Sequence, residues 1–236
     1  ALSALPGELS EELRRIVHEE FARFDQEFPP FNRRIRELER EITRANLERF
    51  ILGDLEEMNS SGFRPAFYEF SFGTDRHGPP DHEQPVVIPL DSIDITVRGT
   101  IDRIDRKGDL YYRVIDYKSG AARGHTTLAR KIDEGQKLQL ALYAIAAESI
   151  FGVDAAAISG AVRPMGGDGR PRDTHRFELA ERRELLIENL TLFTTAILEG
   201  RFPALPSDDG ACKFCSMKLS CRSRHDPEER RRMRRF

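Results

Sequence analysis

Three residues close together in the sequence have the types and spacing needed for metal-assisted hydrolysis. Asp102 precedes Asp116 by fourteen positions, and Lys118 follows two positions later. Two carboxylates offer the hard oxygen ligands that Mg²⁺ or Mn²⁺ takes, and a bound cation acidifies water for attack on a phosphodiester. The Lys118 ammonium would orient that water or stabilise the charge that builds on the phosphate. The main-chain carbonyl of Tyr117 is a further candidate metal ligand.

A predicted β-hairpin would position these side chains. Residues 93–104 and 110–118 alternate between apolar and polar side chains and are rich in β-branched and aromatic residues. Between them, residues 106–109 predict a tight turn centred on Gly108, which accepts the positive backbone angle that such turns need. The fold-back would bring the two carboxylates together. The second carboxylate and the lysine, two residues apart on one strand, would share a face.

The segments outside the hairpin predict a mixed α/β (α+β) chain. Apolar residues at helical spacing between positions 8 and 58 predict two or three helices, which Pro29 and Pro30 divide. Five further segments are expected to be a strand over 66–72, a loop over 73–85, a helix over about 135–151, a strand over 156–162 and a helix over 178–199. The strand over 66–72 would pair with the hairpin in antiparallel fashion.

The composition indicates a soluble globular protein. Of 236 residues, 39% are hydrophobic and 33% charged, with a net charge of −3. No segment approaches the roughly 20 apolar residues of a membrane span, and charged residues interrupt the first twenty positions, unlike a secretory signal. We therefore expect an intracellular protein. Residues 222–236 hold seven arginines against three acidic residues, a net of +4, which could touch phosphates or form a solvated helix end.

An isolated Asp-x-Lys pattern is weak, because alternating charges on a strand more often form a solvated face. Its neighbours make the pattern specific. In order, the chain carries Gly99-x-x-Asp102, the predicted turn, Asp116-Tyr117-Lys118 and Gln139-x-x-x-Tyr143 on a predicted helix.

In this order the motifs resemble those of the RecB/AddB family of nuclease domains, within the PD-(D/E)xK superfamily. The resemblance covers about residues 10–222. It implies a restriction-endonuclease-like core with a central mixed sheet flanked by helices. It also implies three parts: an N-terminal helical segment at 1–60, a nuclease core at 61–200, and a C-terminal cysteine motif and basic tail at 201–236. Asp102 and Asp116 would be metal ligands and catalytic residues, and Lys118 the catalytic lysine.

The same resemblance suggests four supporting residues. Gln139 and Tyr143 would line the site and help to hold DNA. His18 would complete the metal shell from an upstream helix, although a histidine on a helix is more often an ordinary surface or buried residue. Glu69 matches an acidic position before the hairpin and would support the site, or it would face solvent between inward-pointing aromatic residues.

Three cysteines occupy ten residues near the C-terminal end. The pattern Cys212-x2-Cys215-x5-Cys221 can bring three thiolates around one inorganic centre. Zinc is one candidate, and free cysteines are another reading. The family resemblance implies a 4Fe-4S cluster held by these three residues and a fourth cysteine ahead of the nuclease core, which this sequence lacks.

The combined prediction is a Mg²⁺- or Mn²⁺-dependent exonuclease that hydrolyses DNA. It would be the nuclease domain of a helicase-nuclease in double-strand break repair and recombination, cytoplasmic on nucleoid DNA, with a helicase domain or subunit as partner and no membrane contact. Two alternatives stay open: a non-catalytic DNA-binding or scaffold module of the same fold, and a free-standing CRISPR-associated or phage-type exonuclease. The start at Ala1, without a methionine, favours a piece of a longer polypeptide.

Overall fold

The computed structural model describes residues 5–76, 78–91, 93–118, 128–165, 175–202, 212–213, 215–217 and 220–221. The chain divides into two compact units, Ala1–Asn189 and Leu190–Phe236. The first unit holds the sheets and most of the helices. The second begins within the last helix and includes the described cysteines. The three-part division at residues 60 and 200 stays a prediction.

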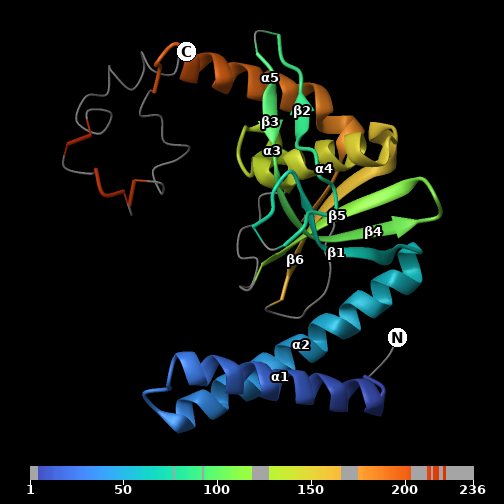
Figure 1. The fold of residues 1–236 in the computed structure, drawn as a ribbon, viewed down its shortest axis with the longest axis vertical. Coiled ribbons are helices and arrows are strands. Elements are labelled where there is room, and N and C mark those ends of the chain that lie inside the picture. The colour runs from blue at the N-terminus through green and yellow to red at the C-terminus, as the bar shows by residue number, and fades with distance from the viewer. Residues whose placement is uncertain are drawn as a thin grey trace. The chain divides into compact units, whose positions relative to one another are not determined.

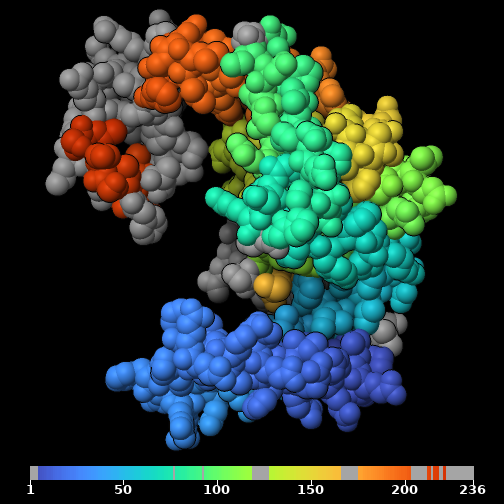
Figure 2. Space-filling view, viewed as in Figure 1, coloured from blue at the N-terminus to red at the C-terminus, as the bar shows by residue number. Residues whose placement is uncertain are grey.

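Two antiparallel helices, α1 (Gly7–Glu27) and α2 (Arg33–Ser61), form the N-terminal region, as the helical spacing predicted. The Asn32 side chain begins α2 by accepting the first free main-chain amides, and Gly62, with a φ of 77°, ends it. The two helices pack against each other over the N-terminal part of α2, where their atoms form one continuous blue body in Figure 2, and α2 then continues to the central sheet (Figure 1). An ion pair of 2.9 Å between Arg36 Nε and Asp25 Oδ1 joins them.

A five-stranded mixed sheet forms the centre, in the order β1-β4-β5-β6-β7 (Figure 1). Its strands are β1 (Arg64–Phe72), β4 (Gly99–Lys107), β5 (Tyr111–Lys118), β6 (Ile158–Pro164) and β7 (Arg176–Glu178). Neighbours pair antiparallel except β5 and β6, which are parallel. The predicted hairpin is β4 and β5, and Gly108 takes a φ of 58° in its turn. The mixed α/β fold of a restriction-endonuclease-like core is thereby confirmed.

Several boundaries differ from those expected. The segment 93–104 contains two strands: β3 (Ile95–Val97) pairs with β2 (Val86–Ile88) in a separate two-stranded sheet, and β4 joins the central one. The helix expected over 135–151 is α4 (Leu138–Phe151), preceded by a separate short α3 (Leu128–Asp133). The last expected helix is α5 (Leu179–Leu198).

Helices α2 and α4 cover opposite faces of the central sheet. Tyr112 of β5 stacks on Phe151 of α4, with ring centroids 4.2 Å apart, whereas the next residue, Arg113, bonds to Glu57 of α2 at 2.6 Å. Successive side chains of a strand point to opposite faces, so the two helices lie on different sides. The α4 side is the apolar core, lined by fully buried residues such as Ile104 and Val114.

No helix in the described part of the chain combines the length and apolar character needed to cross a bilayer.

Candidate active site in the β4-β5 hairpin

The hairpin brings Asp102 to the segment that holds Asp116 and Lys118. The Asp102 Oδ2 atom accepts a hydrogen bond of 2.7 Å from the main-chain amide of Tyr117. One residue before that amide, Asp116 is 9% exposed, and its Oδ2 atom lies 2.6 Å from Lys118 Nζ. Lys118 itself is half-exposed. The arrangement therefore gathers two carboxylates and one ammonium at the open end of the hairpin.

The alternation of side chains breaks at Asp102. A Cβ atom on Gly99 would lie 2.8 Å from the Tyr143 hydroxyl of α4, so position 99 faces the α4 side. Arg103 has the same parity but bonds to Asp54 of α2, on the other side. The strand thus changes face between these positions. The orientation of Asp102 comes from its bond to the Tyr117 amide and not from simple alternation.

The neighbouring strand β1 also has an irregular residue, and that residue lies opposite Asp102. Tyr68 pairs with Arg103 and Phe70 pairs with Ile101, which leaves Glu69 across from Asp102. Glu69 has a φ of 49°, a left-handed conformation that non-glycine residues adopt only at a cost. It is exposed. The structure therefore places this predicted supporting residue beside Asp102 in a strained stretch of β1, and its role stays a prediction.

Gln139 and Tyr143 approach the site from α4. Their side chains bond to each other, with 3.3 Å from Gln139 Nε2 to the Tyr143 hydroxyl. Tyr143 packs edge-on against Phe72, and its hydroxyl fills the space in front of Gly99. A glycine is required at position 99 because a larger side chain would overlap Tyr143. The motif Gly-x-x-Asp and the motif Gln-x-x-x-Tyr therefore meet in space.

This packing gives a testable result for Gly99→Ala. The added methyl would lie 2.8 Å from the Tyr143 hydroxyl and 3.0 Å from its Cε1 atom, so the ring must move. We expect a loss of about 1–3 kcal/mol in the free energy of unfolding, as in other overpacked sites. Denaturant unfolding would measure it. The loss should shrink in a Tyr143→Leu background, and an equal loss in both backgrounds would contradict the explanation.

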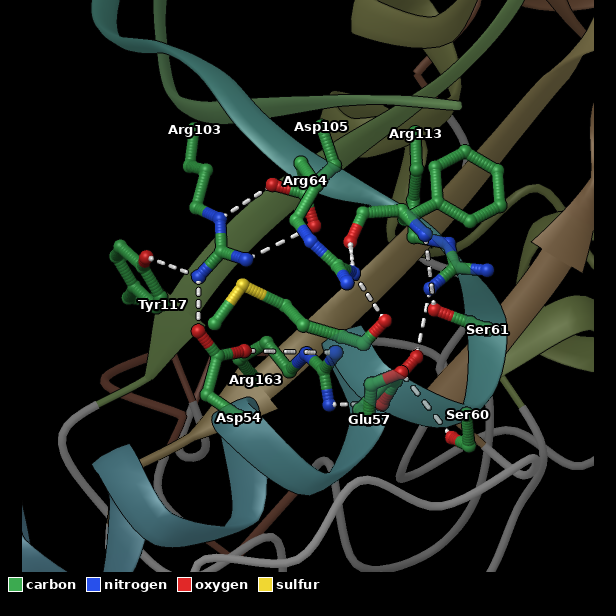
Figure 3. Close-up of polar contacts among 12 residues, drawn as sticks. Asp54, Glu57, Ser60, Ser61, Arg64, Arg103, Asp105, Arg113, Tyr117 and Arg163 are labelled. Atoms are coloured by element: carbon green, nitrogen blue, oxygen red, sulfur yellow. Dashed lines mark hydrogen bonds and ion pairs between the residues drawn. The ribbon is translucent and has the colours of Figure 1, made fainter. Parts of the chain in front are cut away.

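On the α2 side of the sheet lies a layer of buried charged residues, which we call the charged layer (Figure 3). Its buried members are Asp54, Glu57, Arg103, Asp105, Arg113 and Arg163, and the partly exposed Arg176 joins it at the edge. Glu57 receives three arginines: Arg113 and Arg163, each at 2.6 Å, and Arg176. Burial opposes the ionised form of Glu57, but Arg163, Arg176 and Arg113 together outweigh it and lower its pKa.

Arg103 connects the charged layer to the hairpin. It bonds to Asp54 at 2.5 Å and to Asp105 at 2.5 Å, and its NH1 atom lies 3.4 Å from the Tyr117 hydroxyl. Burial opposes its charged form, but the bonds to Asp105 and Asp54 raise its pKa. Burial raises the pKa of Tyr117 as well.

The charged layer was not among the predicted site residues. Arginine and aspartate on a strand are typical of a solvent-exposed face. The sequence pattern therefore did not indicate that these residues would be buried. Two features carried the signal. Asp54 and Glu57 stand three residues apart in a helix, and Arg103, Asp105 and Arg113 occupy one face of two neighbouring strands.

The two hairpin carboxylates suit a hard divalent cation. Both supply oxygen ligands, and Asp116 already forms an ion pair with a cation, the Lys118 ammonium. Within the described residues, however, no group of three or more histidine, cysteine, aspartate or glutamate side chains is arranged to hold a metal ion. His18 is exposed on α1, where its Nδ1 atom lies 3.4 Å from Arg40 NH1. Its assignment as a third ligand stays a prediction.

The second unit, taken by itself, contains the three cysteines. Cys212 and Cys221 are partly buried, and Cys215 is exposed. In the part of this unit that the structure describes, they do not form a three-thiolate metal group. Both the 4Fe-4S cluster and the zinc alternative stay predictions. The basic residues 222–236 lie outside the described residues.

Parts of the chain are similar in sequence to known proteins. A segment of 75 residues is 43% identical to an ATP-dependent helicase/deoxyribonuclease subunit of Clostridium novyi, covering 30% of this chain and 6% of that protein. A segment of 103 residues is 37% identical to the same subunit of Pelotomaculum thermopropionicum, covering 42% and 8%. Gene 69 protein of Mycobacterium phage D29 is 33% identical over 147 residues, covering 61% and 48%. The chain thus matches only a small part of the two helicase/deoxyribonuclease proteins and about half of the phage protein.

Among solved structures, the chain is similar to SSO0001, with a TM-score of 0.33 and 14% identity over 91% of this chain and 84% of the other. The sequence profile of the PD-(D/E)XK nuclease superfamily matches residues 2–222, which include the hairpin, α4 and the cysteines. The chain therefore belongs to the PD-(D/E)XK nuclease superfamily.

Proposed function

We propose that this chain is a metal-dependent deoxyribonuclease that hydrolyses phosphodiester bonds at the open end of the β4-β5 hairpin. The observation that carries the proposal is the bond from the Tyr117 amide to Asp102. That bond holds one carboxylate beside the segment that bears Asp116 and Lys118. Membership of a nuclease superfamily supports the same chemistry.

Each residue of the hairpin has a distinct task in this proposal. Asp102, Asp116 and the Tyr117 carbonyl would hold Mg²⁺ or Mn²⁺, which supplies Lewis acidity and a more acidic water when bound. Lys118, half-exposed at the edge of the site, would orient the attacking water and stabilise charge on the phosphate. His18 and Glu69 are proposed as supporting residues. The bonded pair Gln139 and Tyr143 would hold the DNA strand against the hairpin.

The biological setting is also proposed. The relatives from Clostridium novyi and Pelotomaculum thermopropionicum carry the words helicase and deoxyribonuclease in their names, which supports a DNA substrate and a helicase domain or subunit as partner. We propose an exonuclease role in double-strand break repair and recombination on nucleoid DNA in the cytoplasm. A 4Fe-4S cluster on Cys212, Cys215 and Cys221 would need a fourth ligand, and this sequence has no fourth cysteine.

Metal-dependent DNA cleavage tests the proposal. Linear single- and double-stranded DNA should be degraded with Mg²⁺ or Mn²⁺ and left intact with EDTA. Calorimetric titration with Mn²⁺ should show binding that weakens at least about 10- to 100-fold in Asp102→Asn, since changing even the partners that orient a metal ligand costs that much. Asp109→Asn, at an exposed acid in the hairpin turn, is the matched control.

Three results would count against a metal-dependent nuclease site at the hairpin. Degradation in EDTA would exclude the metal site. Equal Mn²⁺ affinity in the wild type and Asp102→Asn would remove Asp102 from it. DNA binding without Mn²⁺ binding would favour a non-catalytic module of the same fold.

A further inference from the structure

Tyr117 joins two parts of the molecule that otherwise lie on different sides of the sheet. Its main-chain amide donates to Asp102 at 2.7 Å, and the residue also bears the carbonyl proposed as a metal ligand. Its side chain points the other way, into the α2 side. There the hydroxyl lies 3.4 Å from Arg103 NH1, and the ring packs edge-on against Phe50 with centroids 5.6 Å apart. A shift of Tyr117 would therefore change both the bond to Asp102 and the contacts on the α2 side of the sheet.

Arg103 is well suited to fix the Tyr117 side chain. Its side chain is 2% exposed and held at 2.5 Å by both Asp54 and Asp105, so the guanidinium has little freedom to move (Figure 3). Asp54 belongs to α2, which anchors the arginine outside the hairpin. Arginine offers several donors in a rigid plane, which lets it serve two carboxylates and a hydroxyl at once.

We propose that Arg103 is a positioning residue for the hairpin site. Held by Asp54 and Asp105, it fixes the Tyr117 side chain, and so fixes the Tyr117 amide on which the Asp102 carboxylate rests. Arg103 does not touch the reacting groups. Its effect on catalysis runs through the placement of Asp102 and the Tyr117 carbonyl. The inference rests on the proposed function, since it concerns the geometry of the same metal site.

Arg113 provides a matched control within the charged layer. It is also a buried arginine on the α2 side of the hairpin, paired with an acid of α2 at 2.6 Å and stacked 4.0 Å over the Phe63 ring. Its side chain contacts Glu57, Ser159 and Phe63 rather than Tyr117. Both arginines should contribute to stability, but only Arg103 should affect metal binding.

The experiment compares Arg103→Lys, Arg113→Lys and Tyr117→Phe in the 236-residue chain. Lysine keeps the charge but loses the planar set of donors. The readouts are Mn²⁺ affinity by calorimetry and the half-saturating Mg²⁺ concentration for DNA cleavage. We expect Arg103→Lys to weaken metal binding about tenfold, and Tyr117→Phe, which removes one long hydrogen bond, about two- to tenfold. Arg113→Lys should leave both values within about twofold of the wild type.

The outcomes separate this inference from the proposed function. If Arg103→Lys and Arg113→Lys have equal metal affinity and the wild type cleaves DNA, the positioning role of Arg103 is wrong and the proposed function stands. A wild type that neither binds Mn²⁺ nor cleaves DNA overturns both proposals. If Arg103→Lys fails to fold, Tyr117→Phe decides, because it leaves every ion pair of the charged layer in place. Unchanged metal affinity in Tyr117→Phe would then contradict the positioning role.

Discussion

Replacing Lys118 or Asp116 with alanine should sharply reduce DNA cleavage while leaving the fold in place. Lys118 is 53% exposed on its side chain, but its partner at 2.6 Å, Asp116, is buried, so losing this ion pair should cost about 1–3 kcal/mol. Cleavage should fall about 100- to 1,000-fold, the loss seen when one group that stabilises transition-state charge is removed. Single-turnover assays with saturating Mg²⁺ would measure it.

Lys107→Ala is the control for the loss of a positive charge near DNA. Lys107 is exposed at the turn end of β4, five residues from Asp102, and lies 5.9 Å from the Phe63 ring. It should retain cleavage within a few-fold of the wild type. Equal losses in Lys107→Ala and Lys118→Ala would indicate general electrostatic attraction of DNA. Activity that survives in both Lys118→Ala and Asp116→Ala would place the site elsewhere.

Glu57→Ala should have the largest effect on stability. Its carboxylate is the shared partner of three arginines in the charged layer, two of them at 2.6 Å, and its side chain is 4% exposed. Alanine would remove the carboxylate that pairs with the buried Arg113 and would leave the buried Arg163 with only its longer contact of 3.7 Å to Asp54. Breaking a buried pair in this way costs about 3–5 kcal/mol. Urea unfolding followed by circular dichroism would measure the change.

An exposed pair supplies the comparison for Glu57. Glu39 bonds to Arg36 at 2.9 Å with its side chain 52% exposed, and Glu39→Ala should cost less than about 1 kcal/mol. Similar costs for the two substitutions would show that the charged layer contributes little beyond a surface contact.

The stability of the folded chain should also depend on pH through Glu57. Folding lowers the pKa of this carboxyl below its ordinary value of 4.5. A lowered carboxyl pKa contributes stability that is fully present above pH 4.5 and lost as the pH falls through the folded value. The free energy of unfolding should therefore decline below pH 4.5, and Glu57→Gln should make that decline shallower. An unchanged acid profile in Glu57→Gln would contradict the assignment.

Long elements with a clear period were predictable from the sequence. Helices α1 and α2 follow apolar residues at helical spacing, separated by Pro29 and Pro30, and the β4-β5 hairpin follows alternation around Gly108. Strands β2 and β7 were missed, since three residues are too few to show a period. The break between β3 and β4 was missed because residues 93–101 alternate without interruption, whereas only pairing with different partners separates the strands.

The proximity of the candidate site residues was predictable, but the means of holding them was not. Two aspartates, a residue type that binds metals, on two strands joined by a tight turn are enough to suggest that their carboxylates meet. The bond from the Tyr117 amide to Asp102 involves main chain, which no side-chain pattern records. The left-handed Glu69 likewise has no signature in residue type, because its conformation is imposed by tertiary pairing.

The change of face at Asp102 affects how far this motif can be moved between proteins. A hairpin transplanted into a regular sheet would keep its aspartates and lysine, yet ordinary alternation would turn either position 99 or position 103 to the wrong side. Glu69, with its φ of 49°, lies on a strand more than thirty residues earlier in the chain. A graft that keeps the geometry of the candidate site therefore needs all three strands, β1, β4 and β5. A two-stranded graft would contain the candidate ligands but would not orient them.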